Sequence, residues 1–367
     1  MRLIKYILLL CYGLHLATTG LRADGPDTLI SKQALDAFLN DAEAKGFVGI
    51  VGISGPDGTI YGRGFGTTGN GAQVYSLETV NDIASITKQF TGAAILKLME
   101  QGKLNLHDRL DRFFKILPED KKAITLHHLL THTADLPDTV GPDEEAIDRD
   151  TYLARVFGTP LITEPGTRHA YSNTGYSLLA AVIEVASGQP YETYLFDNLW
   201  QPAAMFTTGY YRPDWHGRSF PALSEPHNGL TSAKDLLDQT AGKTWHLFGN
   251  GGILSSANDM LKWHRALISG RILSAGSKDF LMKPHVPEDD SNIYHYGYGW
   301  SIVPNFHGHK LVWHNGGSYF SRAEFWRFPD SGIGIFIATH DRSVEPFFIA
   351  DGIAAVLDGR PPRPVQP

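Results

Sequence analysis

The segment Ser85-Ile86-Thr87-Lys88 places a hydroxyl and an amine three positions apart, which brings both side chains to one face of a helix. Residues 89–96 are mostly apolar, as is typical of the start of a buried helix. A serine at such a start lies near the positive end of the helix dipole, and a buried lysine nearby can lose its charge and act as a base. The segment therefore predicts a nucleophilic serine activated by a lysine. A serine cap followed by a solvated lysine is the alternative for these four residues alone.

Two further segments carry polar groups that suit the same chemistry. Tyr171-Ser172-Asn173 precedes an apolar helical pattern and is therefore predicted to lie in a loop. Its phenol can shuttle a proton if nearby cations lower its pKa, and its amide can orient Lys88 or bind a substrate carbonyl. A turn in which Ser172 or Asn173 caps the next helix explains the same residues.

The third segment, His314-Asn315-Gly316-Gly317, follows a strand predicted at residues 310–313. Paired glycines allow a substrate backbone to lie close to a strand edge, where an exposed amide can donate to an oxyanion. A glycine-containing bulge beside a partly buried histidine is the alternative.

The apolar pattern predicts strands at both ends of the chain and short helices between them. The predicted strands are residues 47–54, 59–66, 298–303, 310–313, 324–328 and 333–339. The predicted helices are residues 28–45, 85–101, 124–132, 151–156, 176–187 and 347–357. This order favours an α+β fold with one antiparallel sheet flanked by helices and an inserted, mostly helical region. We expect a discontinuous α/β sheet domain over residues 28–107 and 243–358, a helical domain over 108–242 and a flexible tail over 359–367.

The first 23 residues have the layout of a secretory signal peptide. Arg2 and Lys5 precede an apolar run over residues 6–16, and small and polar residues follow it. The run is too short for a comfortable membrane span, so we expect cleavage after Ala23 and a secreted or periplasmic protein without a stable membrane span. An uncleaved N-terminal anchor is the alternative.

Composition narrows the class of protein further. Hydrophobic residues make up 42% of the 367 residues and charged residues 19%, which is ordinary for a globular protein. The net charge of -7, with no basic blocks, predicts no nucleic-acid partner. The single cysteine, Cys11, lies in the N-terminal apolar run, so the mature chain has no thiolate nucleophile and no disulfide.

In this order the three polar segments resemble the motif set of penicillin-binding enzymes and serine β-lactamases. Residues 129–137, 251–260 and 296–300 also resemble stretches of the class C β-lactamase, D,D-peptidase and family VIII esterase superfamily, and the resemblance spans about residues 30–357. It implies Ser85 as nucleophile, and Lys88 and Tyr171 as the proton-transfer pair. It also implies an oxyanion hole made by the backbone amides of Ser85 and Gly317. The substrate-binding positions that it implies are Asn173, His314, Gly316 and Gly317.

Departures from the family pattern bear on the substrate. His314 stands where a typical β-lactamase has lysine, a permanent cation for a substrate carboxylate, whereas histidine is mostly neutral near pH 7. This change resembles some D,D-peptidases and esterases, and it argues against efficient β-lactam hydrolysis without excluding it. Arg322 can replace the missing cation, although a solvated arginine explains that residue too. Asp135 replaces the family's glycine in a loop, with no evident chemical role.

Other chemistries lack their motifs. No Gly-x-Ser-x-Gly surrounds any serine, so the nucleophile elbow of α/β-hydrolases is absent. His128 and His132 are four apart, but the glutamate of a His-Glu-x-x-His zinc motif is missing, so we expect no metal. No glycine-rich loop suits a phosphate.

The leading hypothesis is an exported serine hydrolase that forms an acyl-enzyme on Ser85 and needs no cofactor. Its substrates would be small esters, amides or D-amino-acid peptides. A catalytically silent scaffold or sensor with the penicillin-binding fold is one alternative, and a true β-lactamase is another. The presence of Ser85, Lys88 and Tyr171 together argues against a silent protein, because such a protein has no chemical reason to hold all three.

Overall fold

The computed structural model describes residues 27–69, 73–161 and 163–365. The predicted signal peptide and Cys11 lie outside these residues, so the cleavage site stays a prediction. Within the described residues, no helix combines the length and apolar character that a membrane span requires.

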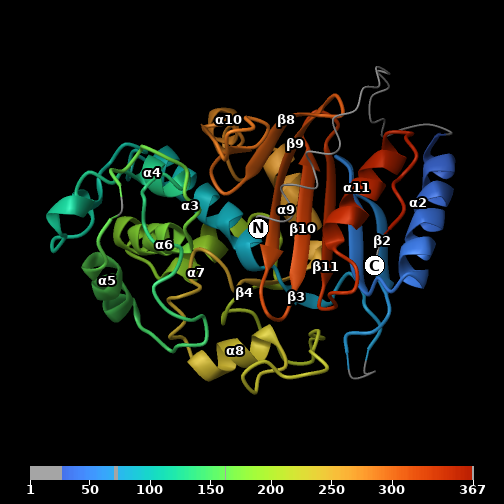
Figure 1. Ribbon diagram of the computed structural model, residues 1–367, viewed down its shortest axis with the longest axis horizontal. Coiled ribbons are helices and arrows are strands. Elements are labelled where there is room, and N and C mark those ends of the chain that lie inside the picture. The colour runs from blue at the N-terminus through green and yellow to red at the C-terminus, as the bar shows by residue number, and fades with distance from the viewer. Residues whose placement is uncertain (1–26, 70–72, 162, 366–367) are drawn as a thin grey trace.

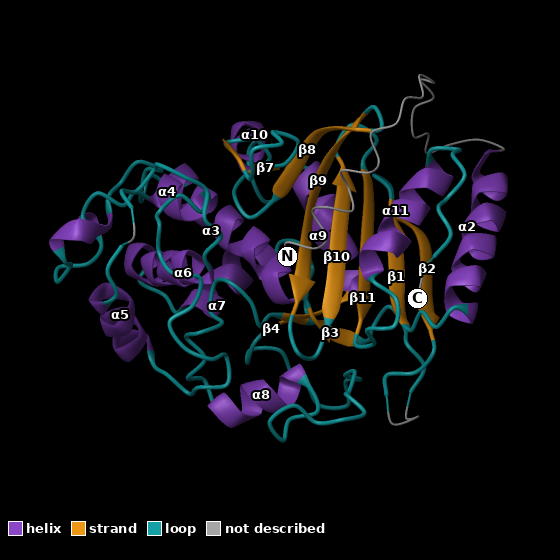
Figure 2. Cartoon of the chain, in the orientation of Figure 1, coloured by secondary structure: helices purple, strands orange, loops and turns teal. Residues whose placement is uncertain are grey.

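One antiparallel sheet of eight strands forms the centre of the molecule, in the order β2-β1-β11-β10-β9-β8-β7-β6 (Figure 2). The N-terminal strand β1 pairs with the C-terminal strand β11, so the two ends of the chain share one sheet, as predicted. The strands are β1 (Gly49–Ser54), β2 (Thr59–Phe65), β6 (Val286–Pro287), β7 (His295–Tyr296), β8 (Ser301–Phe306), β9 (His309–Gly317), β10 (Arg322–Phe328) and β11 (Ile333–Thr339).

Helices cover both faces of this sheet and fill the region beside it (Figure 1). Those in contact with the sheet or beside it are α2 (Asp27–Ala44), α9 (Ala257–Ile268), α10 (Ala275–Leu281) and α11 (Pro346–Leu357). The others are α3 (Lys88–Glu100), α4 (Leu126–Leu130), α5 (Arg149–Gly158), α6 (Asn173–Ser187), α7 (Tyr191–Leu195) and α8 (Ala233–Thr240). Three short 3-10 turns are η1 (Ala84–Thr87), η2 (Leu110–Arg112) and η3 (Glu119–Lys121), and a π-turn, η4 (Phe196–Trp200), follows α7.

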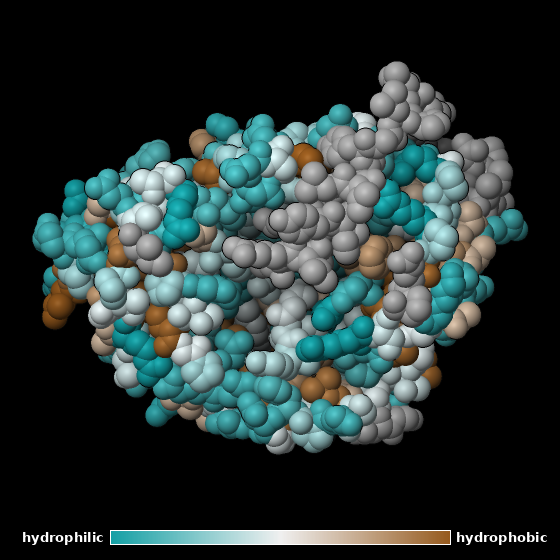
Figure 3. Space-filling model, in the orientation of Figure 1, coloured by the Kyte–Doolittle hydropathy of each residue, from teal (hydrophilic) through white to brown (hydrophobic). Residues whose placement is uncertain are grey.

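The side chains of each strand point alternately to the two faces of the sheet, which explains why helices cover both faces. In β11, Ile335 and Ile337 belong to a core shared with α2 and α11, whereas Phe336 and Ala338 belong to the core that contains α9 and α3. Successive side chains of a strand point to opposite faces, so a strand that is apolar at every position must be covered on both sides. The molecular face seen in Figure 3 is mostly hydrophilic, and its apolar residues form separate patches.

The structure differs from the sequence-based prediction at several boundaries. β9 runs through Gly317, so His314 to Gly317 lie within the strand and not after it. α6 begins at Asn173, so only Tyr171 and Ser172 remain in the loop. A small second sheet was not predicted; its strands, in the order β3-β5-β4, are β3 (Val80–Asp82), β5 (Leu254–Ser256) and β4 (Thr208–Gly209).

Most of the C-terminal segment is exposed, at Gly359, Pro361, Arg363 and Pro364, so the flexible tail stays a prediction. Val365 is buried in the core formed with α2 and α11, and Arg360 donates to the Asp358 carboxylate at 2.6 Å. The boundaries proposed for the sheet and helical domains stay predictions.

Candidate active site

Ser85 lies in η1, immediately before α3, on a backbone turn of unusual conformation. The preceding residue, Ala84, has φ of 43°, a left-handed value that costs an alanine on the order of 1 kcal/mol. The Asp82 carboxylate accepts a hydrogen bond from the Ala84 N–H at 2.8 Å and helps to hold this turn. The strained turn presents the Ser85 side chain at the wall of a cleft.

Lys88 is fully buried and is the first residue of α3. Its Nζ lies 3.2 Å from Ser85 Oγ, 2.7 Å from Asn173 Oδ1 and 2.8 Å from the Asn250 carbonyl oxygen. The predicted i, i+3 contact between the amine and the serine hydroxyl is therefore present, and the alternative of a solvated lysine is wrong.

Burial sets the protonation of Lys88. Loss of solvation lowers the pKa of this amine from 10.5 to about 7, while the Asp138 and Asp143 charges act in the opposite direction. At neutral pH a large fraction of the amine is therefore uncharged and able to accept a proton.

Asn173 is held in one orientation between the Lys88 amine and the Asp138 carboxylate. The Asp138 carboxylate accepts from the Asn173 N–H at 3.2 Å and from Nδ2 at 3.0 Å, which leaves Oδ1 to face Lys88. The preceding Ser172 caps α6 by accepting from the Gly175 N–H at 3.0 Å. The segment therefore provides both a helix cap, through Ser172, and an amide in contact with Lys88, through Asn173.

Tyr171 lies beside Lys88 with its hydroxyl directed at Ser85. Lys88 Nζ is 4.8 Å from the centre of the phenol ring, and the buried Tyr171 hydroxyl completes no hydrogen bond within the described residues. Burial raises the pKa of the Tyr171 phenol far above its ordinary value, and the Ser85 hydroxyl offsets this only in part. The condition set for a proton shuttle, a pKa lowered by nearby cations, is therefore not met, and the Tyr171 phenol is neutral at ordinary pH.

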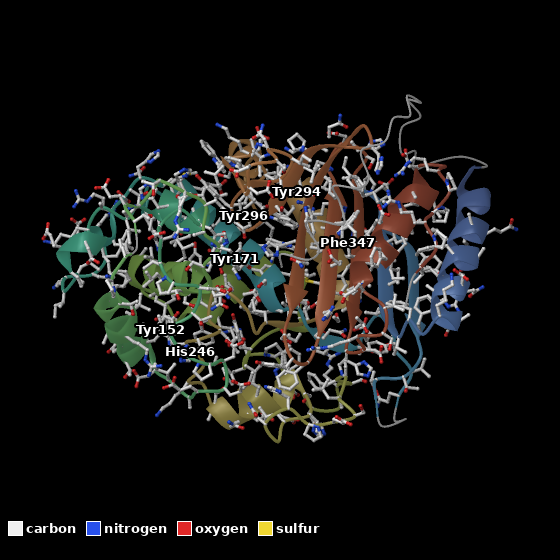
Figure 4. All side chains as sticks on the ribbon, in the orientation of Figure 1. Tyr152, Tyr171, His246, Tyr294, Tyr296 and Phe347 are labelled. Carbon is white, nitrogen blue, oxygen red and sulfur yellow. The ribbon has the colours of Figure 1, made fainter. Side chains whose placement is uncertain are left out.

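A cluster of rings supports Tyr171 from behind. The His132 ring lies 4.2 Å from the Tyr171 ring, and His132 Nδ1 accepts from the Ser172 N–H at 3.1 Å. Tyr171 and Tyr296 lie near one another between the helical region and the sheet (Figure 4). His132 thus positions the loop before α6, while His128 closes a capping box with Thr125 at the start of α4.

His314 lies in the same ring cluster. Tyr296 Oη is 3.0 Å from His314 Nε2, and His314 Nδ1 is 2.6 Å from the Asn315 carbonyl oxygen, so Nδ1 carries the proton and Nε2 accepts from the tyrosine. The His314 side chain is buried behind Tyr171 and is not among the residues that line the cleft. Direct contact of His314 with substrate therefore stays a prediction. Arg322 pairs with Glu345 and does not line the cleft either.

Gly316 allows β9 to lie against the Ser85 turn. A Cβ at this position would lie 2.2 Å from the Ile83 carbonyl oxygen and 3.2 Å from the Ala84 Cβ. Real side chains do not approach backbone atoms so closely, so only glycine fits here. Gly317, one residue further on, lines the cleft and has open space where its Cβ would be.

We expect Gly316→Ala to destabilise the protein by about 1–3 kcal/mol, because strand and turn must move apart. Turnover should fall at least roughly tenfold, since small misplacements of reacting groups are costly. Thermal unfolding and steady-state kinetics measure both effects. Gly317→Ala is the matched control for stability, and an equal loss of Tm in both variants would contradict this interpretation.

Asp135 has a structural role in the loop that leads to Tyr171. Its φ of 54° is one that asparagine, aspartate and glycine adopt most easily, which explains why it can replace a glycine. The buried carboxylate accepts from the Thr163 N–H and pairs with Arg168 Nη2 at 2.6 Å. Burial raises the pKa of Asp135, but these two partners outweigh it and leave the pKa lowered.

The cleft beside Ser85 is open to solvent and has a cavity volume of about 100 Å³. Of the seven predicted site residues, Ser85, Asn173 and Gly317 line it, and Asn250, which was not predicted, lines it as well. Lys88 and Tyr171 lie next to Ser85 but are not among the lining residues. In the described part of the chain, no group of three or more histidine, cysteine or carboxylate residues is arranged to hold a metal ion.

Sequence reasoning missed several residues of this site. Asn250 holds Lys88 through a backbone carbonyl, which leaves no signature in the sequence. Asp143 and Glu144 also line the cleft. The only feature of the sequence that could have pointed to these two residues was the acidic run at 143–145, soon after the Leu136-Pro137 stretch.

Known proteins resemble this chain over most of its length. The β-lactamase family model matches residues 33–359. One curated relative, D-alanyl-D-alanine-carboxypeptidase/endopeptidase AmpH of Escherichia coli strain K12, is 30% identical over 224 residues, which are 56% of this chain and 54% of AmpH. The chain spans about half the length of the curated relatives it matches.

Solved structures of known proteins share the fold of this chain. An octameric penicillin-binding protein homologue from Pyrococcus abyssi superimposes with a TM-score of 0.77 and 26% identity, covering 91% of this chain and 79% of the homologue. The D-amino acid amidase from Ochrobactrum anthropi SV3, at 19% identity, shares the fold with a TM-score of 0.73, covering 90% of this chain and 99% of the amidase. The superfamily resemblance seen in the sequence is confirmed, and the chain belongs to the β-lactamase family.

Proposed function

We propose that this protein is an exported serine hydrolase that forms an acyl-enzyme on Ser85. Its substrates are small esters, amides or D-amino-acid peptides. The observation that carries the proposal is the buried Lys88 amine, 3.2 Å from Ser85 Oγ and held by two other acceptors. AmpH is a D-alanyl-D-alanine carboxypeptidase and endopeptidase, and this relative supports a peptide substrate.

The hydrogen bonds of Lys88 prepare it to act as a base. A neutral amine has two N–H donors and one lone pair. Asn173 Oδ1 and the Asn250 carbonyl oxygen can only accept, so they take both N–H groups. The lone pair then faces Ser85 Oγ and accepts its proton as the oxygen attacks the substrate carbonyl.

The remaining steps use groups on the other sides of Ser85. The backbone N–H groups of Ser85 and Gly317 donate to the oxyanion of the tetrahedral intermediate. The neutral Tyr171 phenol donates its proton to the leaving group and recovers one from Lys88, so the C–N or C–O bond breaks without releasing an anion. Water then attacks the acyl-enzyme, which releases the acid and returns the proton to Ser85.

A panel of three substrates tests the substrate class. We expect kcat/KM for a nitrophenyl ester, which carries no carboxylate, to exceed that for a cephalosporin at least roughly tenfold, because no lysine or arginine is among the described residues that line the cleft. A D-alanyl-D-alanine peptide carries a carboxylate as the cephalosporin does, so its rate tests the peptide substrate separately. The three reactions are followed side by side with wild type and Ser85→Ala. A cephalosporin that is much the best substrate would instead make the protein a true β-lactamase. Absence of turnover and of any acylating adduct would favour the silent scaffold.

Export is part of the same proposal and rests on the pattern of residues 1–23. We expect the mature protein in the secreted or periplasmic fraction to begin after Ala23. N-terminal mass analysis of that fraction checks this, and an intact N-terminus in the membrane fraction would show a retained anchor instead.

A further inference from the structure

Carboxylates dominate the charge of the cleft. Asp82, Asp143 and Glu144 all line it, and Asp138 lies just behind Asn173. No lysine or arginine is among the described residues that form its walls. A substrate carboxylate would meet repulsion here, whereas a cation would be attracted.

Most of these carboxylates already have partners, but one does not. Asp82 accepts from the Ala84 N–H, Asp138 accepts from Asn173, and Glu144 Oε1 lies 3.2 Å from His227 Nε2. Asp143 forms no hydrogen bond and no ion pair with any described residue. Burial and the neighbouring carboxylates raise the pKa of Asp143 to about 6, and the Lys88 amine offsets this in part. Asp143 therefore carries a charge at neutral pH without a cation in direct contact.

The opposite wall of the cleft is apolar. Leu236 and Leu237 of α8, together with Leu247 and Phe320, face the same space as Ser85. Leu236, Leu247 and Phe320 pack into one small buried cluster, so this wall is a fixed surface. It provides a place for the hydrocarbon side chain of a substrate.

A second feature lies beside Ser85, where the scissile bond of a substrate would be placed. The buried Tyr171 hydroxyl faces Ser85 and completes no hydrogen bond within the described residues. A buried polar group without a partner is costly, and the leaving group of a bound substrate would supply that partner.

We propose that the cleft selects substrates that carry a protonated amine near the scissile carbonyl and an apolar side chain. Asp143, supported by Glu144, binds the ammonium group, and the wall of Leu236, Leu247 and Phe320 binds the side chain. The substrates are amides, esters or short peptides of apolar amino acids whose amino group is free. This inference rests on the proposed function and specifies its substrate class. Ser85 forms the ester bond while the C–N bond breaks, the leaving amine takes the proton, and water then releases the free amino acid.

The test compares the 4-nitroanilides of D- and L-phenylalanine with their N-acetyl derivatives at pH 6.5, which lies below the ordinary α-amino pKa of about 7.7–8.0, so the free amine is largely protonated. A change in the protonation of Lys88 affects both substrates alike, so it cancels from the ratio of their kcat/KM values. Acetylation removes the positive charge and leaves the side chain intact. In wild type we expect kcat/KM for the better free-amine enantiomer to exceed that of its acetylated form at least roughly tenfold, as is usual for a lost charged hydrogen bond.

Two variants locate the recognition. Asp143→Asn should lower the ratio of free-amine to acetylated kcat/KM about tenfold, and Glu144→Gln should lower it less because His227 already pairs with Glu144. Asp330→Asn, which neutralises an exposed carboxylate in the turn between β10 and β11, is the matched control and should leave the ratio unchanged. Thermal unfolding of each variant confirms that it folds.

A measurement on wild type alone guards against variants that fail to fold. Phenethylamine should inhibit competitively at concentrations at which phenylacetate does not. An acetylated substrate that is cleaved as fast as the free amine, or equal inhibition by the two probes, would overturn the amine inference and leave the hydrolase intact. Cleavage that persists in Ser85→Ala would instead overturn the proposed function.

Discussion

Replacing Ser85 by alanine is expected to lower kcat for every substrate by at least roughly 10⁴-fold, to near the background rate. The Lys88 amine and the Gly317 amide would remain in place, but the covalent route would be lost because no other hydroxyl occupies the position of Ser85 Oγ. Lys88 keeps its contacts with Asn173 and Asn250, so the variant should fold with nearly unchanged Tm. Steady-state kinetics and thermal unfolding measure the two effects.

Ser76→Ala is the matched control, because it removes an exposed serine hydroxyl that does not line the cleft. It should retain wild-type turnover. Hydrolysis that survives in Ser85→Ala at more than a few per cent of wild type would mean that another group is the nucleophile.

Lys88→Met should lower kcat/KM by roughly 10³-fold or more, because general-base catalysis typically contributes 10²–10⁴-fold and the amine also shapes the site around Ser85. Methionine has a similar length and no charge. It leaves Asn173 Oδ1 and the Asn250 carbonyl oxygen without their donor, so Tm is a necessary companion measurement.

The pH profile of wild type tests the same residue without mutation. Because the pKa of Lys88 is lowered to about 7, kcat/KM should rise about tenfold per pH unit below pH 7 and level off above it. A folded-state pKa below the unfolded value of 10.5 means that the unfolded chain binds more protons between pH 7 and 10.5, so the contribution of Lys88 to stability increases with pH across that window. A rate that is flat from pH 5 to 9 would contradict a lysine base.

Much of the fold was predictable because its main elements have strong apolar patterns. β11 matches its predicted bounds, since seven buried residues in a row leave little alternative to a strand covered on both faces. β9 was predicted too short, because Gly316 and Gly317 have low strand propensity and only pairing with β10 holds them in the sheet. The small sheet could not be predicted, because its strands β3, β4 and β5 have only two or three residues each. So few residues cannot show the alternation of apolar and polar side chains that indicates a strand.

The site was predictable where spacing or motif carries the chemistry. The i, i+3 relation of Ser85 and Lys88 follows from helix geometry, and the contact of Asn173 with Lys88 was among the predicted options. Partners that act through the backbone, such as Asn250, are invisible in sequence. Asp143 resembles any solvated loop aspartate until the fold places it in the cleft, and the raised pKa of Tyr171 depends on burial that no local pattern reveals.

The most direct test of the acyl-enzyme is the intact mass of the protein after rapid quenching with a fluorophosphonate or penicillin probe, followed by peptide mapping. We predict one adduct per chain, located on Ser85, that forms faster as the pH rises through 7 and is absent from Ser85→Ala. An adduct on any other residue, or no Ser85-dependent adduct with any acylating probe, would contradict the proposal.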